Sequence, residues 1–214
     1  MRTTRWFIAG LVCSAFFSVR VEAQARYFDN SWFWGVKSGV ATFSPTLGDN
    51  QHAATFGGEW LITRSRGGLY ISGDQANVST VSAVLDANTS DGVRPVTVSK
   101  LRRVGFAALA FPVTFGRVRP YAGLGLSVDI VGSATPLLGA KETGVDDAVQ
   151  QRIDDNKSQA GLLGMAGVQV QFERLAIFGQ ASVINAQSKF LLGNSAMGFF
   201  EGGIRYNIGS SRSR

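Results

Sequence analysis

The sequence predicts an all-β protein, an eight-stranded antiparallel up-and-down barrel that crosses a membrane. After an N-terminal export signal, many segments alternate between apolar residues and small or polar residues. Such period-2 alternation places successive side chains on opposite faces of a strand. The connections between these segments alternate between tight turns and longer polar loops. Short turns on one side and long loops on the other are typical of a transmembrane β-barrel.

The N-terminus has the three parts of a secretory signal peptide. Arg2 and Arg5 precede an apolar run at 6–19, and small residues at Ala23 and Ala25 form two cleavage patterns. A run of 14 residues is short for a helical membrane anchor. We therefore predict three segments: a signal peptide at 1–23, cleaved after Ala23 or Ala25, a barrel at 26–209 and a short basic tail at 210–214.

Composition narrows the possible functions. Charged residues make up 17% of the 214 residues, glycine occurs 26 times, and the chain has one His and one Cys. One His and one Cys supply too few side chains for a metal cluster or a disulfide framework, and we expect no cofactor. Cleavage of the signal reduces the formal charge from +6 to +4. Basic residues do not gather with aromatic residues as they do in nucleic-acid-binding folds, so we expect no nucleic acid partner.

The strand assignments follow the alternation in chain order. In the first strand Trp34 and Val36 lie on one face and Lys37 on the other, and in the second Trp60 alternates with Glu59. The third and fourth strands are less regular, and Pro112 marks an edge, a bulge or an interruption. The fifth, sixth and eighth strands show clear alternation. The eight predicted strands are 32–43, 54–65, 68–82, 97–115, 117–132, 157–172, 175–187 and 196–208.

The chemistry of the two faces separates two kinds of barrel. A soluble lipocalin-like binder also has eight strands and an export signal, but its apolar face points inward. Here one face is apolar with aromatic residues near the strand ends, which is typical of a lipid-facing surface. The other face carries charges such as Lys37 and Glu201, which can share a filled lumen only if they pair. The membrane barrel is therefore favoured, with the lipocalin-like binder as the alternative.

Two segments carry a family resemblance. One is 111–128, which contains Pro120-Tyr121-Ala122-Gly123-Leu124-Gly125 after a tight turn, and the other is the closing segment 198–206. Both resemble the small outer-membrane barrels of Gram-negative bacteria, of the OmpA/OmpX type. The resemblance implies insertion into the bacterial outer membrane, with outer-membrane lipid, lipopolysaccharide and the assembly machinery as partners. One departure is that 209–214 continues past the aromatic residue on which such chains commonly end.

Four inward-facing charges form the candidate site. In a closed barrel the eighth strand neighbours the first, and the first neighbours the second. Lys37, Glu59, Glu201 and Arg205 are therefore predicted to form a lumenal ionic cluster. Two roles are possible for this cluster. Its charges neutralise one another inside a filled barrel, or they gate a narrow water path. A narrow pore or small-ligand conduit is thus the alternative to a structural or surface-interaction role.

We do not expect an enzyme, although lipid-modifying enzymes exist on this fold. The sole histidine, His52, is predicted in the first long loop, with no serine beside it. The longer loops 83–96 and 133–156 are predicted outside the cell, where they offer surface for an extracellular partner. Within the second loop, Val145, Val149 and Ile153 recur every four residues and predict a short amphipathic helix.

Overall fold

The computed structural model describes residues 28–47, 49–139, 142–185, 189–193 and 196–210. The predicted signal peptide and most of the basic tail lie outside these residues. The strands are β1 (Ser31–Phe43), β2 (Gln51–Thr63), β3 (Gly67–Leu85), β4 (Val93–Ala110), β5 (Val118–Pro136), β6 (Ser158–Phe172), β7 (Leu175–Ile184) and β8 (Met197–Ser210), with the helix α3 (Asp147–Asp155) between β5 and β6.

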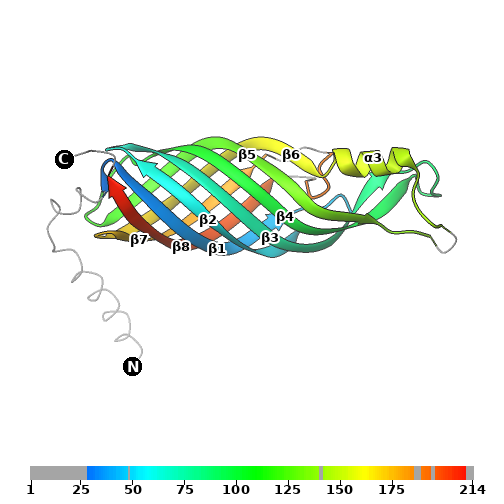
Figure 1. The fold of residues 1–214 in the computed structure, drawn as a ribbon, viewed down its shortest axis with the longest axis horizontal. Helices are drawn as coiled ribbons and strands as arrows, with labels where there is room; N and C mark the ends of the chain where they lie inside the picture. The colour runs from blue at the N-terminus through cyan, green and yellow to red at the C-terminus, as the bar shows by residue number, and fades with distance from the viewer. Residues whose placement is uncertain (1–27, 48, 140–141, 186–188, 194–195, 211–214) are drawn as a thin grey trace, which may run out of the picture.

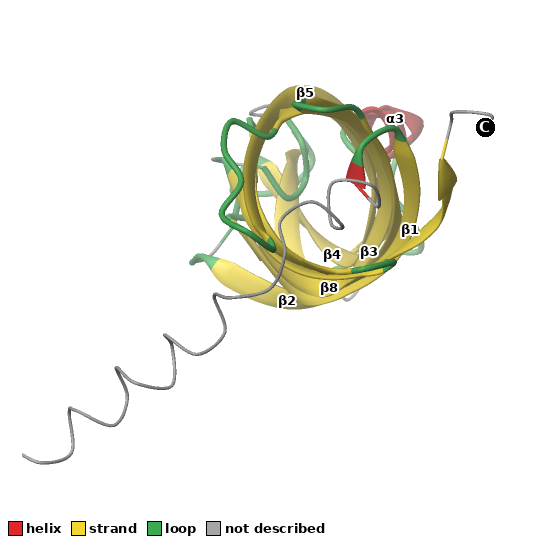
Figure 2. Cartoon of the chain, turned by 90° about the vertical axis from the view of Figure 1, so that its left-hand side faces the viewer, coloured by secondary structure: helices red, strands yellow, loops and turns green. Residues whose placement is uncertain are grey.

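These strands form one closed barrel. Each strand pairs antiparallel with the next along the chain, and β1 pairs with β8 to close the sheet. Figure 1 shows the tilted strands, and Figure 2 shows the ring that they form around the lumen. The prediction of an eight-stranded antiparallel barrel is confirmed. No helix in the described part of the chain is long and apolar enough to cross a membrane.

The two faces of the sheet differ as the alternation predicts. The side chains of Trp34, Val36 and Leu124 point outward and are 54%, 69% and 77% exposed. Lys37 and Glu59 point inward and are buried. The structure therefore places the apolar face outside and the charged face inside, which is the opposite of the arrangement in a lipocalin-like barrel.

The three central strands have other bounds than the sequence analysis predicts: β3 and β5 are longer, and β4 is shifted toward the N-terminus. The β3–β4 hairpin remains paired up to Leu85 and Val93, so the predicted loop 83–96 shrinks to 86–92. The alternation breaks near Ala76, where a β-bulge shifts the register and the strands continue beyond it. At its other end β4 stops at Ala110, because Pro112 has no backbone N–H with which to continue the ladder.

The loops also differ in detail from the predictions. β5 runs to Pro136, and the predicted amphipathic helix is α3, in which Val149 and Ile153 are buried. The side chain of Asp146 caps this helix by accepting from the backbone N–H of Val149 at 2.8 Å. His52 lies on β2 and not in a loop, because the β1–β2 hairpin pairs as far as Gln51.

Candidate functional site

The four predicted charges all lie inside the barrel. Lys37 comes from β1, Glu59 from β2, and Glu201 and Arg205 from β8, and all four are buried. Gly35 of β1 lies directly between Glu59 and Arg205 in the register. A Cβ atom at Gly35 would lie 3.0 Å from the Cγ atom of Glu59, so the missing side chain leaves space for this pair.

The structure joins these four residues into two ion pairs. The guanidinium of Arg205 pairs with the carboxylate of Glu59. The ammonium of Lys37 lies 2.8 Å from Glu201 Oε2, and 2.9 Å from Oδ1 of Asp74 on β3. Since buried charges are stable only when they are paired, these contacts explain how the charges fit inside a narrow barrel.

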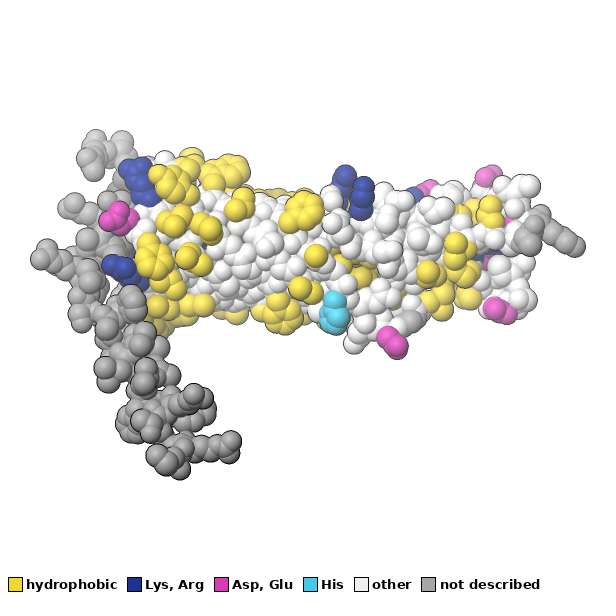
Figure 3. Space-filling model, turned by 90° about the horizontal axis from the view of Figure 1, so that it is seen from below, with side chains coloured by type: hydrophobic (Ala, Val, Ile, Leu, Met, Phe, Trp, Pro, Cys, Tyr) yellow, Lys and Arg dark blue, Asp and Glu magenta, His cyan; other side chains and the backbone are white. Residues whose placement is uncertain are grey.

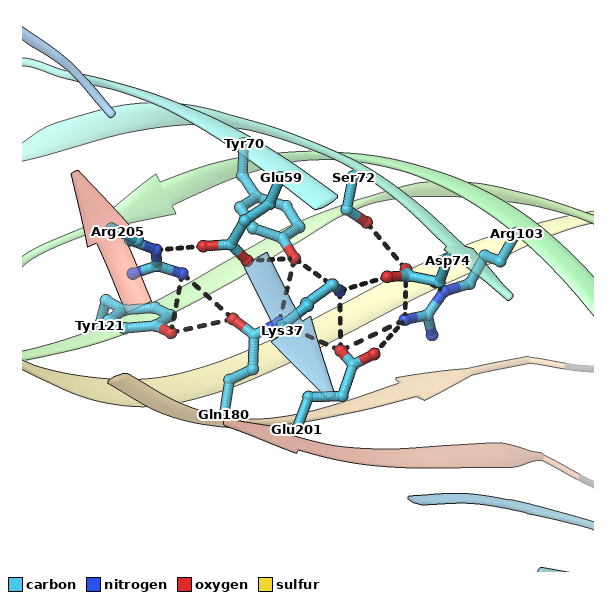
Figure 4. Close-up of polar contacts among 10 residues, drawn as sticks. All are labelled: Lys37, Glu59, Tyr70, Ser72, Asp74, Arg103, Tyr121, Gln180, Glu201 and Arg205. Atoms are coloured by element: carbon cyan, nitrogen blue, oxygen red, sulfur yellow. Dashed lines mark hydrogen bonds and ion pairs between the residues drawn. The ribbon is translucent and has the colours of Figure 1, made fainter. Parts of the chain in front are cut away.

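The sequence analysis missed two charged members of the network. Asp74 on β3 and Arg103 on β4 form an ion pair at 2.8 Å, and Arg103 also lies 3.3 Å from Glu201. They lie on the strands with the least regular alternation. The period-2 series Tyr70, Ser72, Asp74 was the signal that could have placed β3 correctly. With these two residues, the network drawn in Figure 4 has three cationic and three anionic side chains and is formally neutral.

Neutral side chains connect the two ion pairs (Figure 4). The Tyr70 hydroxyl donates to Glu59 at 3.1 Å and accepts from Lys37 and from Gln180 at 3.0 Å. The amide of Gln180 also donates to Glu201 at 3.2 Å and accepts from Tyr121 at 2.9 Å. A hydrogen-bonded path therefore runs across the lumen from Arg205 to Arg103.

Apolar layers close the lumen on both sides of the network. Toward the termini, Phe28, Phe33 and Phe111 are buried, and the rings of Phe28 and Phe111 are 4.8 Å apart. On the other side, Phe199 is buried and the Arg103 guanidinium lies 3.6 Å from its ring centroid. The gap lined by Tyr70, Arg103 and Gln180 between these layers is too small for a water molecule. In this part of the lumen the described side chains therefore fill the space between the two layers.

Comparisons with known proteins support the fold. No protein-family model matches the chain, and no curated protein matches it in sequence. Among solved structures, the Neisserial surface protein A has a TM-score of 0.54 at 15% identity, covering 83% of this chain and 97% of its own. Ail, the attachment invasion locus protein of Yersinia pestis, has a TM-score of 0.51 at 13% identity, covering 85% of this chain and 100% of its own.

Both of these structures are small outer-membrane barrels of eight strands. At 15% and 13% identity the likeness concerns the fold, while the narrower resemblance to the OmpA/OmpX type stays a prediction. The closed ring of eight strands agrees with this likeness. The chain therefore has the fold of the small eight-stranded outer-membrane barrels.

Proposed function

We propose that this protein spans the bacterial outer membrane and presents a rigid extracellular surface for interaction with a partner. One observation carries the proposal: the lumen is closed, while β3, β4 and β5 continue beyond the rest of the barrel as a structured projection (Figure 1). The start of β1 and the end of β8 lie at the opposite end of the barrel. We place that end in the periplasm and the projection outside the cell.

The outer wall supports a membrane position. Apolar side chains gather on the barrel at the end of the short turns, as Figure 3 shows in yellow. Trp32, Trp34 and Trp60 lie on this outer wall, with the rings of Trp34 and Trp60 stacked at 5.6 Å. Aromatic residues at this level are typical of the girdle at a membrane interface. On the far side of the apolar band, exposed Lys100 and Arg102 mark the other interface.

The hydrophobic cluster inside the barrel continues into the projection. The helix α3 buries Val149 and Ile153, and the hairpin buries Val84, Val96 and Val98 in the same cluster. Because these side chains exclude water on one side of the projecting strands, the sheet stays ordered where it has left the barrel.

Polar contacts fasten the loops of the projection. Arg94 donates to Asp86 at 2.5 Å and to both carboxylate oxygens of Glu142, at 2.5 and 2.9 Å. The Arg94 guanidinium lowers the pKa of Glu142 to about 2 and also lowers the pKa of Asp86. Asn88 donates to Asp146 at 2.7 Å and so ties the hairpin tip to the start of α3. These contacts favour a preformed surface over flexible loops.

One edge of the projection is not paired with another named strand and is covered only in part, by Thr46. The pairing of β3 with β2 ends at Ala76, and beyond that point β3 pairs only with β4 among the named strands. The backbone N–H of Ala83 points away from β4 and donates to Thr46 at 3.0 Å. The N–H of Val81 points to the same side, because backbone groups alternate along a strand. Such an edge can pair with an extended segment of another chain.

A conduit through the barrel has less support. Conduction would require a path through the charged network and through the apolar layers that contain Phe28 and Phe199. We expect vesicles that contain the protein to release small solutes no faster than empty vesicles.

A lipid-modifying activity is also disfavoured, because His52 points outward from β2. Mass spectra of lipid A with and without the gene test this second point.

Membrane location is tested by gel migration after expression in a Gram-negative host. A closed barrel in the outer-membrane fraction migrates differently on an SDS gel before and after boiling. A protein that is soluble in the periplasm, with one mobility, would contradict the proposal. Lipopolysaccharide and the assembly machinery stay predicted partners.

Surface interaction is tested by comparing cells that express the protein with cells that express Val81→Pro. Proline removes the outward N–H of the β3 edge and leaves the pairing with β4. We expect the wild type to promote cell aggregation or attachment to serum-coated glass, and Val81→Pro to reduce it. Val81→Thr keeps the N–H and serves as the matched control. Equal attachment by wild-type and empty-vector cells would contradict the proposed role.

A further inference from the structure

A cavity of about 610 Å³ lies where the projection meets the loops of the barrel. Its walls come from the β1–β2 loop, β3, β4, α3, β6 and the β7–β8 loop, so segments far apart in the sequence meet here. Two of its lining residues, Leu47 and Leu85, are 40% and 68% exposed, and the cavity is therefore open to the surface. Its volume is typical of sites for small molecules, which measure roughly 300–1,000 Å³.

Hydrogen bonds between the walls hold the cavity in shape. The hydroxyl oxygens of Thr46 and Ser82 are 2.5 Å apart, and Ser82 donates to the carbonyl of Leu191 at 2.5 Å. The backbone N–H of Leu191 donates to the carbonyl of Asn156 at 3.1 Å. These contacts join the β1–β2 loop, β3, the β7–β8 loop and the end of α3. The cavity is thus preformed, which lowers the entropic cost of binding.

Part of the lining is apolar. Val84 and Phe190 are buried in the hydrophobic cluster that continues into the projection, and they form the inner side of the cavity. Leu47 and Leu85 lie at the surface. A ligand with an apolar body removes these two exposed side chains from water, which favours its binding.

Three charged side chains also line the cavity, those of Arg152, Asp155 and Lys189. All three are exposed, and among the described residues none has a group of opposite charge within 4.0 Å. Two cations and one carboxylate give the lining a net charge of +1. The cavity therefore favours a ligand with a single negative charge.

The other charged residues nearby do not alter this balance. Asp154 and Lys157 pair with each other at 2.6 Å, and Asp86 pairs with Arg94. Asp49, in the same loop as Leu47, does not line the cavity. None of these residues supplies a partner for the two cations of the lining.

The backbone of α3 and one hydrogen bond position Arg152. Its Nη1 atom donates to the carbonyl of Leu85 at 2.8 Å, which holds the guanidinium beside the open edge of β3. This bond uses one of the five N–H groups of the guanidinium. The remaining groups are able to donate to a ligand, and a guanidinium binds a carboxylate through two parallel hydrogen bonds.

We infer that this cavity binds a small organic anion, a molecule with an apolar body and one carboxylate group. The apolar body contacts Leu47, Leu85 and Phe190, and the carboxylate accepts hydrogen bonds from Arg152 and Lys189. This binding activity goes beyond the proposed surface interaction. It requires the folded projection and is independent of the pairing of another chain with the β3 edge.

Equilibrium dialysis with two matched probes tests the inference. The full chain in phosphatidylcholine vesicles is dialysed against 4-phenylbutanoate or against the neutral 4-phenylbutanamide, and binding to empty vesicles is subtracted. We expect saturable binding of about one 4-phenylbutanoate per protein molecule. The amide is expected to bind about tenfold more weakly, because it lacks the charge-assisted hydrogen bonds. Absence of saturable binding, or equal binding of the two probes, would refute the inference.

Variants of the charged lining separate the cavity from other surfaces. Arg152→Gln with Lys189→Gln is expected to weaken the binding of 4-phenylbutanoate about tenfold and to leave the amide unchanged. The matched control, Lys100→Gln with Arg102→Gln, removes the same charge from the outer wall and is expected to bind as the wild type does. Equal affinity of the lining variant and this control would overturn the assignment.

Two further variants guard against a folding defect. Asp155→Asn removes the carboxylate of the lining and is expected to strengthen the binding of 4-phenylbutanoate about threefold, which a misfolded cavity cannot do. Ala83→Phe fills the cavity and is expected to weaken the binding of both probes. Unchanged binding by Ala83→Phe would place the ligand elsewhere and refute the inference.

The cavity and the proposed surface role fail in different assays. Val81→Pro is expected to reduce the attachment of cells and to keep the binding of 4-phenylbutanoate. Equal attachment by wild-type and empty-vector cells contradicts only the surface role. Absence of probe binding by a protein that still promotes attachment refutes only the cavity.

Discussion

Replacing Lys37 by methionine tests whether the lumenal network is structural. Methionine is similar in length and apolar, so the change removes the ammonium and leaves most of the packing volume. In the native barrel this ammonium lies 2.9 Å from Asp74 and 2.8 Å from Glu201, with both side chains almost fully buried. In Lys37→Met, Arg103 remains as the one cation that contacts these two carboxylates, and the network has a net charge of −1.

The expected loss in the free energy of unfolding follows from the burial of the ion pair. Breaking a buried ion pair by removal of one partner costs about 3–5 kcal/mol, because the remaining charge keeps its desolvation penalty. We expect Lys37→Met to lie in this range. The double variant Lys37→Met/Glu201→Gln removes one charge of each sign and restores neutrality. Because coupled residues in contact interact by about 0.5–3 kcal/mol, the double variant is expected to be more stable than the single variant.

The assay is urea unfolding in phosphatidylcholine vesicles, followed by fluorescence of the outer-wall tryptophans. A loss below about 1 kcal/mol for Lys37→Met would refute the reasoning, since such a loss is typical of an exposed pair. A double variant less stable than the single one would contradict the neutrality argument.

Single-channel recording of Lys37→Ala tests the gate hypothesis separately. We expect no new conductance because the apolar layers remain, and a stable open channel would favour a gate.

Three further predictions concern other parts of the molecule. The Arg94–Glu142 contact should persist at pH 5 and disappear as the pH falls from about 4.5 toward about 2, because the pKa of Glu142 is lowered in the folded state. The loss of the contact is measured by protease cleavage of the projection at different pH values. Gly125→Ala should block assembly, since a Cβ atom there would lie 1.8 Å from the carbonyl oxygen of Phe106, and SDS gel migration checks it. Ile153→Asp should release α3 and make the projection protease-sensitive while the barrel still migrates as folded, because the change buries an unpaired charge.

The period-2 pattern was sufficient for the barrel wall, because one face meets an apolar surrounding and the other meets a charged lumen. Lys37 and Glu59 were placed correctly on the inner face for this reason. Asp74 and Arg103 were not identified, because their strands carry polar residues on both faces near the bulge at Ala76. Where both faces of a strand carry polar residues, the alternation weakens and the sequence alone no longer distinguishes a strand from a loop.

The length of the projection depends on contacts between distant segments. The helix α3 packs beside β3, and Arg152 of this helix donates to the carbonyl of Leu85 at 2.8 Å. The hairpin therefore extends into the predicted loop 83–96 because it is covered by the helix α3, whose Arg152 lies 67 positions after Leu85. Local secondary-structure propensities do not take account of such a contact between distant segments. The same limit applies to His52, whose strand position depends on pairing with Thr42.

Charge has opposite consequences inside the barrel and at the end that carries the short turns. In the lumen, three cations and three carboxylates pair within a space that excludes water, so their fields cancel and little charge remains to attract a ligand. At the turns, Arg64, Arg66 and Arg174 are exposed without a carboxylate partner in the described chain, so their fields extend into the surroundings. Ligands are therefore expected where charges stay unpaired, as in the cavity lined by Arg152 and Lys189, while the lumenal network stabilises the wall of the barrel.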